Sequence, residues 1–171
     1  MNAHPGGEAH TRHMLELAAL PAGARILDLG AGAGEAVRLM QELGYEAQGL
    51  DLHPRSPFVQ EGDLLNTVFP DQSFDALLSQ CSFFVSGDTP GALRESRRLL
   101  KPGGLLLLSD VEFEPWDSLL EAAGFSVLLS EDLTECWKEY YIEAIWRGDP
   151  LCCEWPRRRC RYRLLICRKE E

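Results

Sequence analysis

One stretch constrains the fold of this chain more than any other, the segment ARILDLGAGAGEAVRLM at positions 24–40. Its RILDL portion is a short, mainly apolar run of the kind that forms a strand buried on both faces. Three glycines follow at alternating positions, Gly30, Gly32 and Gly34, and apolar residues then recur at helical spacing as far as Gly44. A strand that enters a helix through a bare glycine turn presents unobstructed backbone N–H groups. We therefore expect a ligand to lie against this turn.

The rest of the chain alternates strand patterns with helix patterns. Further strands are expected in YEAQGLDL, FDALLSQ, LLLLSDV, SVLLSEDL and CRYRLLICR. Helices are expected in HTRHMLELAAL, GALRESRRLL, WDSLLEAAGF and ECWKEYYIEAIWRGD, and a turn is expected in KPGG. Strands that alternate with helices predict an α/β fold with a mostly parallel sheet covered on both faces. No linker or repeat divides the 171 residues, so residues 1–171 are expected to form a single domain.

One connection in this alternation is short. Only HPRSPFVQE separates the second expected strand from GDLL, and Pro54 and Pro57 break any helix there. The crossover helix after the second strand is therefore expected to be reduced or missing. That side of the sheet is expected to be unusually open.

The charge of the chain argues against one class of partner. Its 27 acidic residues outnumber its 17 basic residues, and a surface with a formal net charge of -10 repels a polyanion over most of its area. No nucleic-acid partner is therefore expected. We interpret the basic residues near the C-terminus as a solvated edge strand that its charge keeps from pairing. They are Arg157, Arg158, Arg159, Arg161, Arg163, Arg168 and Lys169.

The sequence carries no sign of a membrane segment or of a metal site. No apolar run approaches the ~20 residues that span a bilayer, and MNAHPGGEAH lacks the apolar core of a signal peptide. A cytoplasmic protein without a membrane partner is expected. The six cysteines form no CxxC pair and no usual zinc spacing, so we expect reduced thiols and no metal.

Two ligand classes use a glycine turn of this kind. The dinucleotide motif GxGxxG requires a glycine at the position of Glu35. Glu35 also places a negative charge at the N-terminus of the helix, where a pyrophosphate would lie. Binding of NAD or FAD is therefore disfavoured, and the alternative is a GxGxG loop.

The GxGxG loop in ILDLGAGAG resembles the first motif of the class I S-adenosylmethionine-dependent methyltransferases. The resemblance continues through EGDLL, FPDQSFDALLSQ and RESRRLLKPGGLLLLSDV, and it covers nearly the whole chain. It implies a loop that wraps the methionine part of S-adenosylmethionine, whose ammonium group tolerates nearby carboxylates. It also implies a doubly wound, Rossmann-like sheet of seven strands in the order 3-2-1-4-5-7-6. The last strand, CRYRLLICR, would be antiparallel and lie between the fifth and the sixth.

The same resemblance implies contacts with the cofactor. Asp51 would accept hydrogen bonds from both ribose hydroxyls, as suits a group that is only an acceptor. Asp63 would bind the adenine amino group beside a backbone contact from Leu64, and Arg12 on the first helix would bind the carboxylate of the cofactor. The expected cofactor-binding residues are Gly30, Ala31, Gly32, Gly34, Asp51, Leu52, Asp63, Leu64, Gln80, Cys81 and Arg12.

The activity implied by the resemblance is methyl transfer from S-adenosylmethionine to a small-molecule acceptor by direct in-line displacement, with S-adenosylhomocysteine as product. Gln80 and Cys81 would lie near the transferred methyl group, and no residue is assigned as catalytic base. The alternative is a non-catalytic S-adenosylmethionine-binding or protein-interaction module, because the missing crossover helix leaves little material for a substrate lid. Self-association as a homodimer is left open.

Within the superfamily, SQCSFFVSGD is most similar to small arsenite-methyltransferase-like enzymes, in which the residue matching Cys81 binds trivalent arsenic. A thiolate suits such a soft metalloid. Ala31 and Ala33, however, stand where those enzymes carry a further cysteine. Arsenite is therefore a minority option, and Cys81 is expected to be a lining residue of the cofactor pocket. The other candidate thiols depart from the pattern of those enzymes; they are Cys136, Cys152 and Cys153.

Several side chains that could carry chemistry have a structural interpretation as well. Asp110 and Glu112 would either orient an acceptor or cap the next helix. His10 and His13 are interpreted as surface or capping residues rather than as a general base. An aromatic stretch at helical spacing is interpreted as core rather than as a substrate cage. It comprises Trp137, Tyr140, Tyr141 and Trp146.

Overall fold

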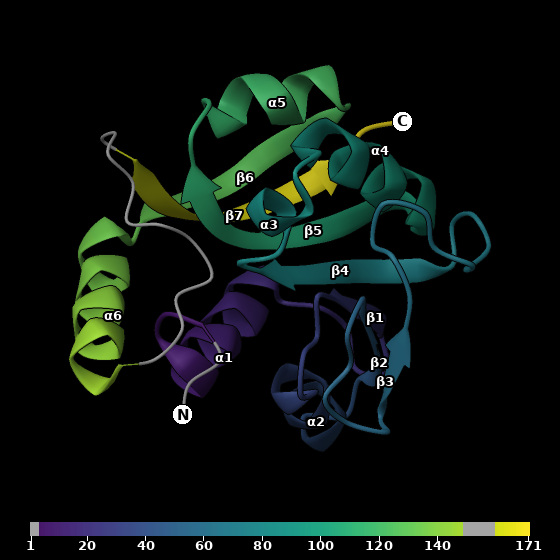
Figure 1. Cartoon of the computed structure of the whole chain (residues 1–171). Coiled ribbons are helices and arrows are strands. Elements are labelled where there is room, and N and C mark those ends of the chain that lie inside the picture. The colour runs from purple at the N-terminus through teal and green to yellow at the C-terminus, as the bar shows by residue number, and fades with distance from the viewer. Residues whose placement is uncertain (1–3, 149–159) are drawn as a thin grey trace.

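The sheet of this protein has the strand order expected above. The computed structural model describes residues 4–148 and 160–171, and within them a seven-stranded sheet runs in the order β3-β2-β1-β4-β5-β7-β6 (Figure 1). The strands are β1 (Arg25–Leu29), β2 (Glu46–Asp51), β3 (Val59–Glu61), β4 (Phe74–Gln80), β5 (Leu100–Glu112), β6 (Phe125–Asp132) and β7 (Arg161–Lys169). The helices are α1 (Gly7–Ala18), α2 (Glu35–Glu42), α3 (Phe83–Ser86), α4 (Thr89–Leu99), α5 (Trp116–Ala122) and α6 (Thr134–Arg147). In this part of the chain, every helix is too short or too polar to cross a membrane.

The C-terminal strand β7 lies inside the sheet. It pairs antiparallel with β5 on one side and with β6 on the other, whereas the strands from β3 to β5 pair in parallel. Tyr162 and Leu164 of β7 are buried, and Arg163 forms an ion pair with Glu112 at 3.1 Å. The interpretation as an unpaired edge strand is therefore wrong for β7, because its apolar residues are buried and this arginine is neutralised locally. The arginines outside the described residues are Arg157, Arg158 and Arg159.

Alternate residues of β1 face opposite sides of the sheet and join different parts of the core. Ile26 belongs to the cluster that contains Met14 of α1 and Met40 of α2. Leu27 belongs to the cluster on the other face, which contains Leu93 of α4. Figure 1 shows α1 and α2 on one side of the sheet and α4 and α5 on the other. Two apolar layers therefore explain why the RILDL run has no solvent-facing side.

A third, smaller cluster closes the end of the sheet next to α6. Trp137 and Tyr141 of α6 are buried against Tyr162 of β7, and the Trp137 and Tyr162 rings stack with their centroids 6.4 Å apart. The aromatic stretch is therefore core at these two positions. Trp146, in contrast, is 85% exposed.

The connection after β2 contains no helix, as predicted. Residues 52–58 form bends and turns, and β3, which the sequence patterns did not locate, is only three residues long. A second connection differs from its prediction. The KPGG segment lies inside β5 rather than in a turn, at a point where the pairing with β4 shifts register between Phe74 and Ala76. An irregularity of the ladder therefore accommodates the proline and glycines without ending the strand.

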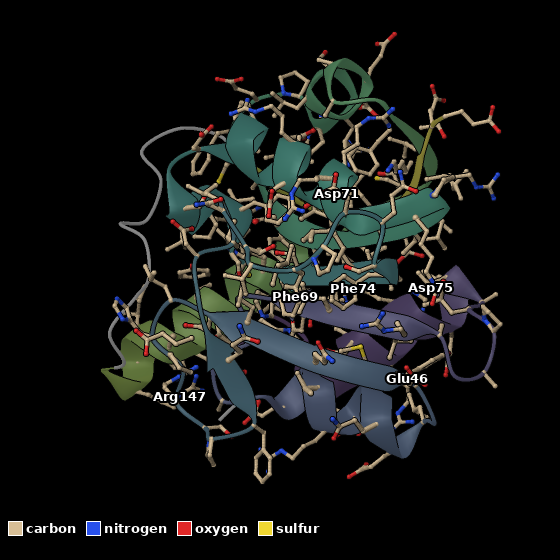
Figure 2. The ribbon with its side chains drawn as sticks, turned by 90° about the vertical axis from the view of Figure 1, so that its right-hand side faces the viewer. Glu46, Phe69, Asp71, Phe74, Asp75 and Arg147 are labelled. Atoms are coloured by element: carbon tan, nitrogen blue, oxygen red, sulfur yellow. The ribbon has the colours of Figure 1, made fainter. Side chains whose placement is uncertain are left out.

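The amino end of the sheet carries charged contacts between neighbouring strands. Asp75 on β4 accepts hydrogen bonds from the backbone N–H of Arg25 at 2.9 Å and from Lys101 Nζ at 2.6 Å. Arg25 also lies 3.9 Å from the Glu46 carboxylate on β2. Figure 2 shows Glu46 and Asp75 at the same end of the sheet. The functional site lies at the opposite, carboxyl end.

Gly49 on β2 allows α2 and the glycine loop to approach the sheet. A Cβ at this position would lie 2.8 Å from the Ala31 Cβ and 2.8 Å from Val37 Cγ2. We expect Gly49→Ala to lower the free energy of unfolding by about 1–3 kcal/mol, because overpacking forces well-packed neighbours apart. Chemical denaturation measures the change, with Gln48→Ala at an exposed position of the same strand as control. Equal effects of the two substitutions would contradict this account.

Candidate functional site

A pocket of about 540 Å³ opens at the carboxyl ends of β1, β2 and β4. The strand order reverses between β1 and β4, and open α/β sheets bind their ligands at such a point. Most of the residues singled out from the sequence line this pocket: Gly30, Ala31, Gly32, Asp51, Leu52, Asp63, Leu64, Gln80 and Cys81. Gly34 and Arg12 do not line it.

The backbone of the loop after β1 explains its glycines. Gly30 and Gly32 have φ angles of +86° and +55°, in the left-handed region that favours glycine. A Cβ on Gly30 would collide with the Ser82 hydroxyl, and one on Gly32 would lie 2.7 Å from Arg55 Nη2. Gly34 instead serves as the N-cap of α2. The first two glycines therefore keep the pocket side of the loop bare.

Asp51 joins this loop to the end of β2. Its Oδ2 accepts a hydrogen bond from the Gly32 N–H at 2.8 Å, and its Oδ1 accepts one from the His53 N–H at 2.8 Å. A carboxylate has about four acceptor sites, so two backbone donors leave acceptor capacity on both oxygens. Asp51 can therefore anchor the loop and still accept hydrogen bonds from a diol in the pocket.

Asp28 is a pocket residue that sequence reasoning missed. It lines the pocket, is only 4% exposed, and makes no side-chain hydrogen bond with any residue that the structure describes. Burial, with a further contribution from the charge of Asp51, raises the pKa of Asp28 to about 7. A carboxyl group within the apolar RILDL strand, just before the glycines, is the signal that could have identified it. A cationic ligand group would compensate its burial.

Charge in the pocket is uneven. The acidic residues that line it are Asp28, Glu35, Asp51 and Asp63. Arg55 is the only arginine or lysine on its described lining, and it comes from the short connection after β2. The backbone N–H of Arg55 donates to the Gly32 carbonyl at 3.0 Å, which fixes this segment beside the loop. The pocket therefore suits a ligand that carries a positive group and one smaller negative group.

The end of β4 ties the first helix to the pocket. Gln80 is buried, and its Oε1 accepts a hydrogen bond from Thr11 Oγ1 at 3.0 Å. Its Nε2 lies 3.4 Å from Nδ1 of His4, another lining residue. Cys81 follows with a φ of +58°, and its N–H donates to the Ser109 carbonyl at 2.9 Å. Gln80 thus positions the start of α1 beside the pocket, and Cys81 forms part of the wall.

Comparison with known proteins shows which family the pocket region resembles. Residues 27–108, from β1 into β5, match the family model described as "Methyltransferase domain". This part of the chain is therefore similar to the class I S-adenosylmethionine-dependent methyltransferases, in agreement with the resemblance seen in the sequence. The match spans the glycine loop, Asp51, Asp63 and the end of β4, so it includes most of the pocket.

Individual relatives of this methyltransferase domain agree with the family match. The demethylmenaquinone methyltransferase of Tropheryma whipplei (strain Twist) is 31% identical over 119 residues, which cover 60% of this chain and 48% of the relative. The arsenite methyltransferase of Aquipseudomonas alcaligenes is 32% identical over 120 residues, which cover 54% of this chain and 34% of the relative. This chain therefore spans about half of the first relative and about a third of the second.

A solved structure shares the fold of the methyltransferase domain. Phosphoethanolamine N-methyltransferase 2 of Haemonchus contortus, in complex with S-adenosyl-L-methionine, matches with a TM-score of 0.78 at 18% identity. The match covers 98% of this chain and 54% of that one. At this identity the likeness concerns the fold alone.

The predicted role of Arg12 requires correction. Arg12 lies on α1 and its Nη2 pairs with Glu8 Oε1 at 2.9 Å on the exposed side of the helix. An i,i+4 pair of this kind is satisfied on the helix surface. The guanidinium on the pocket lining of the methyltransferase domain belongs to Arg55 instead.

Two other acidic candidates have structural roles. Asp110 Oδ2 accepts hydrogen bonds from the backbone N–H groups of Phe83 at 2.9 Å and Phe84 at 3.3 Å, at the start of α3. Burial raises the pKa of Asp110 to about 7, and these backbone donors act in the opposite direction. Glu112 Oε1 accepts from the Trp116 N–H at 3.1 Å, where α5 begins. For Glu112, the interpretation as a cap of the next helix is confirmed.

The two helix histidines lie in different environments. His10 is buried, with Nε2 2.9 Å from Ser109 Oγ, so its interpretation as a surface residue is wrong. Burial, with smaller contributions from the nearby His4 and His13, lowers the pKa of His10 to about 4. His13 Nε2 pairs with the Glu131 carboxylate at 3.0 Å in a partly exposed position. Neither histidine lines the pocket of the methyltransferase domain.

Thiols around the pocket bear on the arsenite option. Within residues 4–148 and 160–171, no group of three His, Cys, Asp or Glu side chains is placed to bind a metal ion. Cys136 is exposed on α6 and does not line the pocket, whereas Cys81 does. Cys152 and Cys153 lie outside the described residues.

The ionisation of Asp28 should be visible in the pH dependence of stability. Its pKa is raised from 3.8 to about 7 by folding, so its contribution to stability falls as pH rises from about 4 through 7. We therefore expect Asp28→Asn to stabilise the domain more at pH 8 than at pH 5, by roughly 1 to 3 kcal/mol. Chemical denaturation at both pH values measures this difference. Asp110, whose pKa is also raised, is present in both the unsubstituted protein and the variant. Its contribution to the pH dependence therefore cancels in the comparison.

The matched control is Glu61→Gln, which removes the same charge from an exposed side chain of β3. Its effect on stability should differ little between the two pH values. A pH-independent effect of Asp28→Asn would show that the buried carboxyl group does not titrate as described.

Proposed function

We propose that this methyltransferase domain transfers the methyl group of S-adenosylmethionine to a small-molecule acceptor by direct in-line displacement. One observation carries the proposal. Asp28, a buried carboxyl group without a hydrogen-bond partner among the described residues, lines the pocket together with a bare glycine loop. S-adenosylmethionine carries an ammonium group that would compensate such a carboxylate. A phosphate ligand would instead be repelled.

Other groups along the pocket fit the remaining parts of the cofactor. The backbone at Gly30 leaves room for the methionine part, and the lone pairs left on Asp51 suit the ribose hydroxyls. Asp63 suits the adenine amino group. Arg55, in place of Arg12, would pair with the carboxylate, because it supplies the only guanidinium on the described lining.

The protein's own contribution to the reaction would be placement of an acceptor and exclusion of water. When bound, the cofactor supplies a methyl group on a positively charged sulfur. Gln80 and His4 hold the start of the described chain beside the pocket. Leu52 and Val85 add apolar surface to the lining for an acceptor. Proximity and alignment in a dry pocket supply most of the rate of such a displacement. A soft sulfur or selenium acceptor needs no base at neutral pH.

The competing function is a non-catalytic cofactor-binding or protein-interaction module. Leu52 and Phe58 favour it, since they are 57% and 70% exposed in the segment that replaces the crossover helix. Incubation with S-adenosylmethionine and a panel of thiol, selenol, amine and phenol acceptors distinguishes the two functions. Acceptor-dependent release of S-adenosylhomocysteine excludes the module, whereas tight binding without any release favours it.

Binding of the cofactor is the direct test. We expect S-adenosylmethionine and S-adenosylhomocysteine to bind, and Asp51→Asn to weaken binding about 10- to 100-fold, because each hydrogen bond to a charged acceptor contributes about 1.5–3 kcal/mol. Isothermal titration calorimetry measures the affinities. Arg12→Ala is the matched control, since its side chain pairs with Glu8 outside the pocket, and it should bind like the unsubstituted protein. The proposal fails if neither ligand binds, or if Asp51→Asn binds them with unchanged affinity.

A further inference from the structure

A line of hydrogen-bonding groups runs through the core to the pocket wall. His10 Nε2 lies 2.9 Å from Ser109 Oγ, and Ser109 Oγ lies 2.5 Å from the Tyr162 hydroxyl. The Tyr162 hydroxyl in turn lies 3.2 Å from Cys81 Sγ. His10, Ser109 and Tyr162 are buried and come from α1, β5 and β7. Elements far apart in the chain therefore combine to reach one thiol.

This line is suited to moving a proton. Each hydroxyl can accept one hydrogen bond while it donates another, and a neutral imidazole accepts at its unprotonated nitrogen. Burial keeps His10 neutral because it lowers its pKa to about 4. Burial and the neighbouring Cys81 raise the pKa of Tyr162 well above its usual value, so that its hydroxyl keeps a proton to donate. The line therefore connects a group able to lose a proton with a neutral imidazole that can relay it.

Cys81 is held at the pocket by its backbone. Its φ of +58° lies in the left-handed region, which a residue with a Cβ occupies only where its surroundings fix it. Here the N–H of Cys81 is bonded to the Ser109 carbonyl, and Asp110 fixes the N–H of Phe83 just beyond. Asp28, more than nine-tenths buried and without a hydrogen-bond partner among the described residues, lines the same pocket. This second, independent feature points to a cationic ligand in the pocket whose lining includes Cys81.

We propose that Cys81 is a self-methylation site, whose thiol takes the methyl group of S-adenosylmethionine when no other acceptor fills the pocket. The inference rests on the proposed function. The bond from the methyl carbon to the cofactor sulfur breaks and leaves its electron pair on that sulfur, which gives S-adenosylhomocysteine. A new bond joins the methyl carbon to Cys81 Sγ. The thiol proton passes to Tyr162, a Tyr162 proton to Ser109, and a Ser109 proton to His10 Nε2. His10 acts only as a relay and releases a proton to solvent, because its imidazole is neutral near pH 7.

Methyl transfer to Cys81 depends on the ionisation state of its thiol. A thiolate, not a thiol, is the nucleophile, and a hydrogen bond from the Tyr162 hydroxyl stabilises the thiolate. Cys81 is thus the reacting residue, and Tyr162 is the positioning residue that also accepts its proton. Tyr162→Phe keeps the ring that stacks on Trp137 but removes the hydroxyl.

The first experiment looks for the modification itself. The full chain is incubated with S-adenosylmethionine alone, and its cysteine peptides are analysed by mass spectrometry. We expect one methyl group on the peptide that contains Cys81, none on that peptide after incubation with S-adenosylhomocysteine, and none after Cys81→Ser. Cys136→Ser, at an exposed thiol outside the pocket, is the matched control and should leave the modification of Cys81 unchanged.

The second experiment measures the thiol without any methyl transfer. Iodoacetamide should alkylate Cys81 in the cofactor-free protein, and S-adenosylhomocysteine should protect Cys81 while Cys136 stays reactive. Tyr162→Phe should slow both alkylation and self-methylation of Cys81 by about tenfold or more, since it removes a hydrogen bond to a charged sulfur. Ser109→Ala keeps the hydroxyl of Tyr162 but interrupts the path to His10, and it should slow self-methylation as well. Calorimetry with S-adenosylhomocysteine checks that each variant still folds and binds.

The outcomes separate this inference from the function on which it rests. Methyl transfer to Cys81 that depends on Tyr162 supports it. Binding of S-adenosylmethionine without methylation of Cys81 overturns the inference and leaves the proposed function standing. Equal methylation of Cys81 and Cys136, or an unchanged rate in a folded Tyr162→Phe variant, also overturns it. Absence of any binding overturns both.

Discussion

The hydrogen bond between the Gly32 N–H and the Asp51 carboxylate fixes the geometry on which the site depends. It joins the loop after β1 to the end of β2, at the point where Gly49 allows Ala31 to approach the sheet. The His53 N–H holds the second carboxylate oxygen, so the side chain of Asp51 has little freedom. The loop is thus set in its conformation by the fold, and a ligand would not have to organise it on binding.

The electrostatics of the pocket work against the stability of the fold. Asp28 is buried beside the charge of Asp51, and this combination raises its pKa because ionisation inside the protein is costly. Natural proteins keep such locally unfavourable groups where function needs them. The short connection after β2 adds the opposite charge, because it places Arg55 against the same loop. Because this connection contains no crossover helix, it can place a basic side chain among the acidic residues of the pocket.

Much of the fold could be predicted because local patterns and tertiary packing agree. The run RILDL, bounded by glycine, is β1 with the bounds expected, and the strand order followed from the resemblance around it. β3 could not be located, since a strand of three residues has too few positions to show a period. KPGG was predicted as a turn because composition alone does not show that a register shift with β4 keeps it in β5.

The site could be predicted where residues act through the backbone or at strand ends, and less well elsewhere. The glycines and Asp51 follow from motif and position. Arg12 was chosen by its place on the first helix, but which face of α1 turns to the pocket depends on the tertiary packing, and Arg12 instead pairs with Glu8. The interpretation of the basic C-terminal residues as an unpaired edge strand was wrong for β7. It considered the charge of these residues without the acidic side chains that pair with them, such as Glu112 with Arg163.

The place of β7 between β5 and β6 has a consequence for how the chain is made. Among the described strands, β6 reaches the sheet only through β7, which is synthesised after it. During translation β6 must therefore wait without a partner until residues 161–169 emerge, and β5 presents an open edge in the same interval. Tyr162 arrives with that strand, so the side chain that contacts Cys81 is synthesised after every residue that lines the pocket. A chain stalled before β7 would therefore carry every residue that lines the pocket but lack the Tyr162 hydroxyl that contacts the Cys81 thiol.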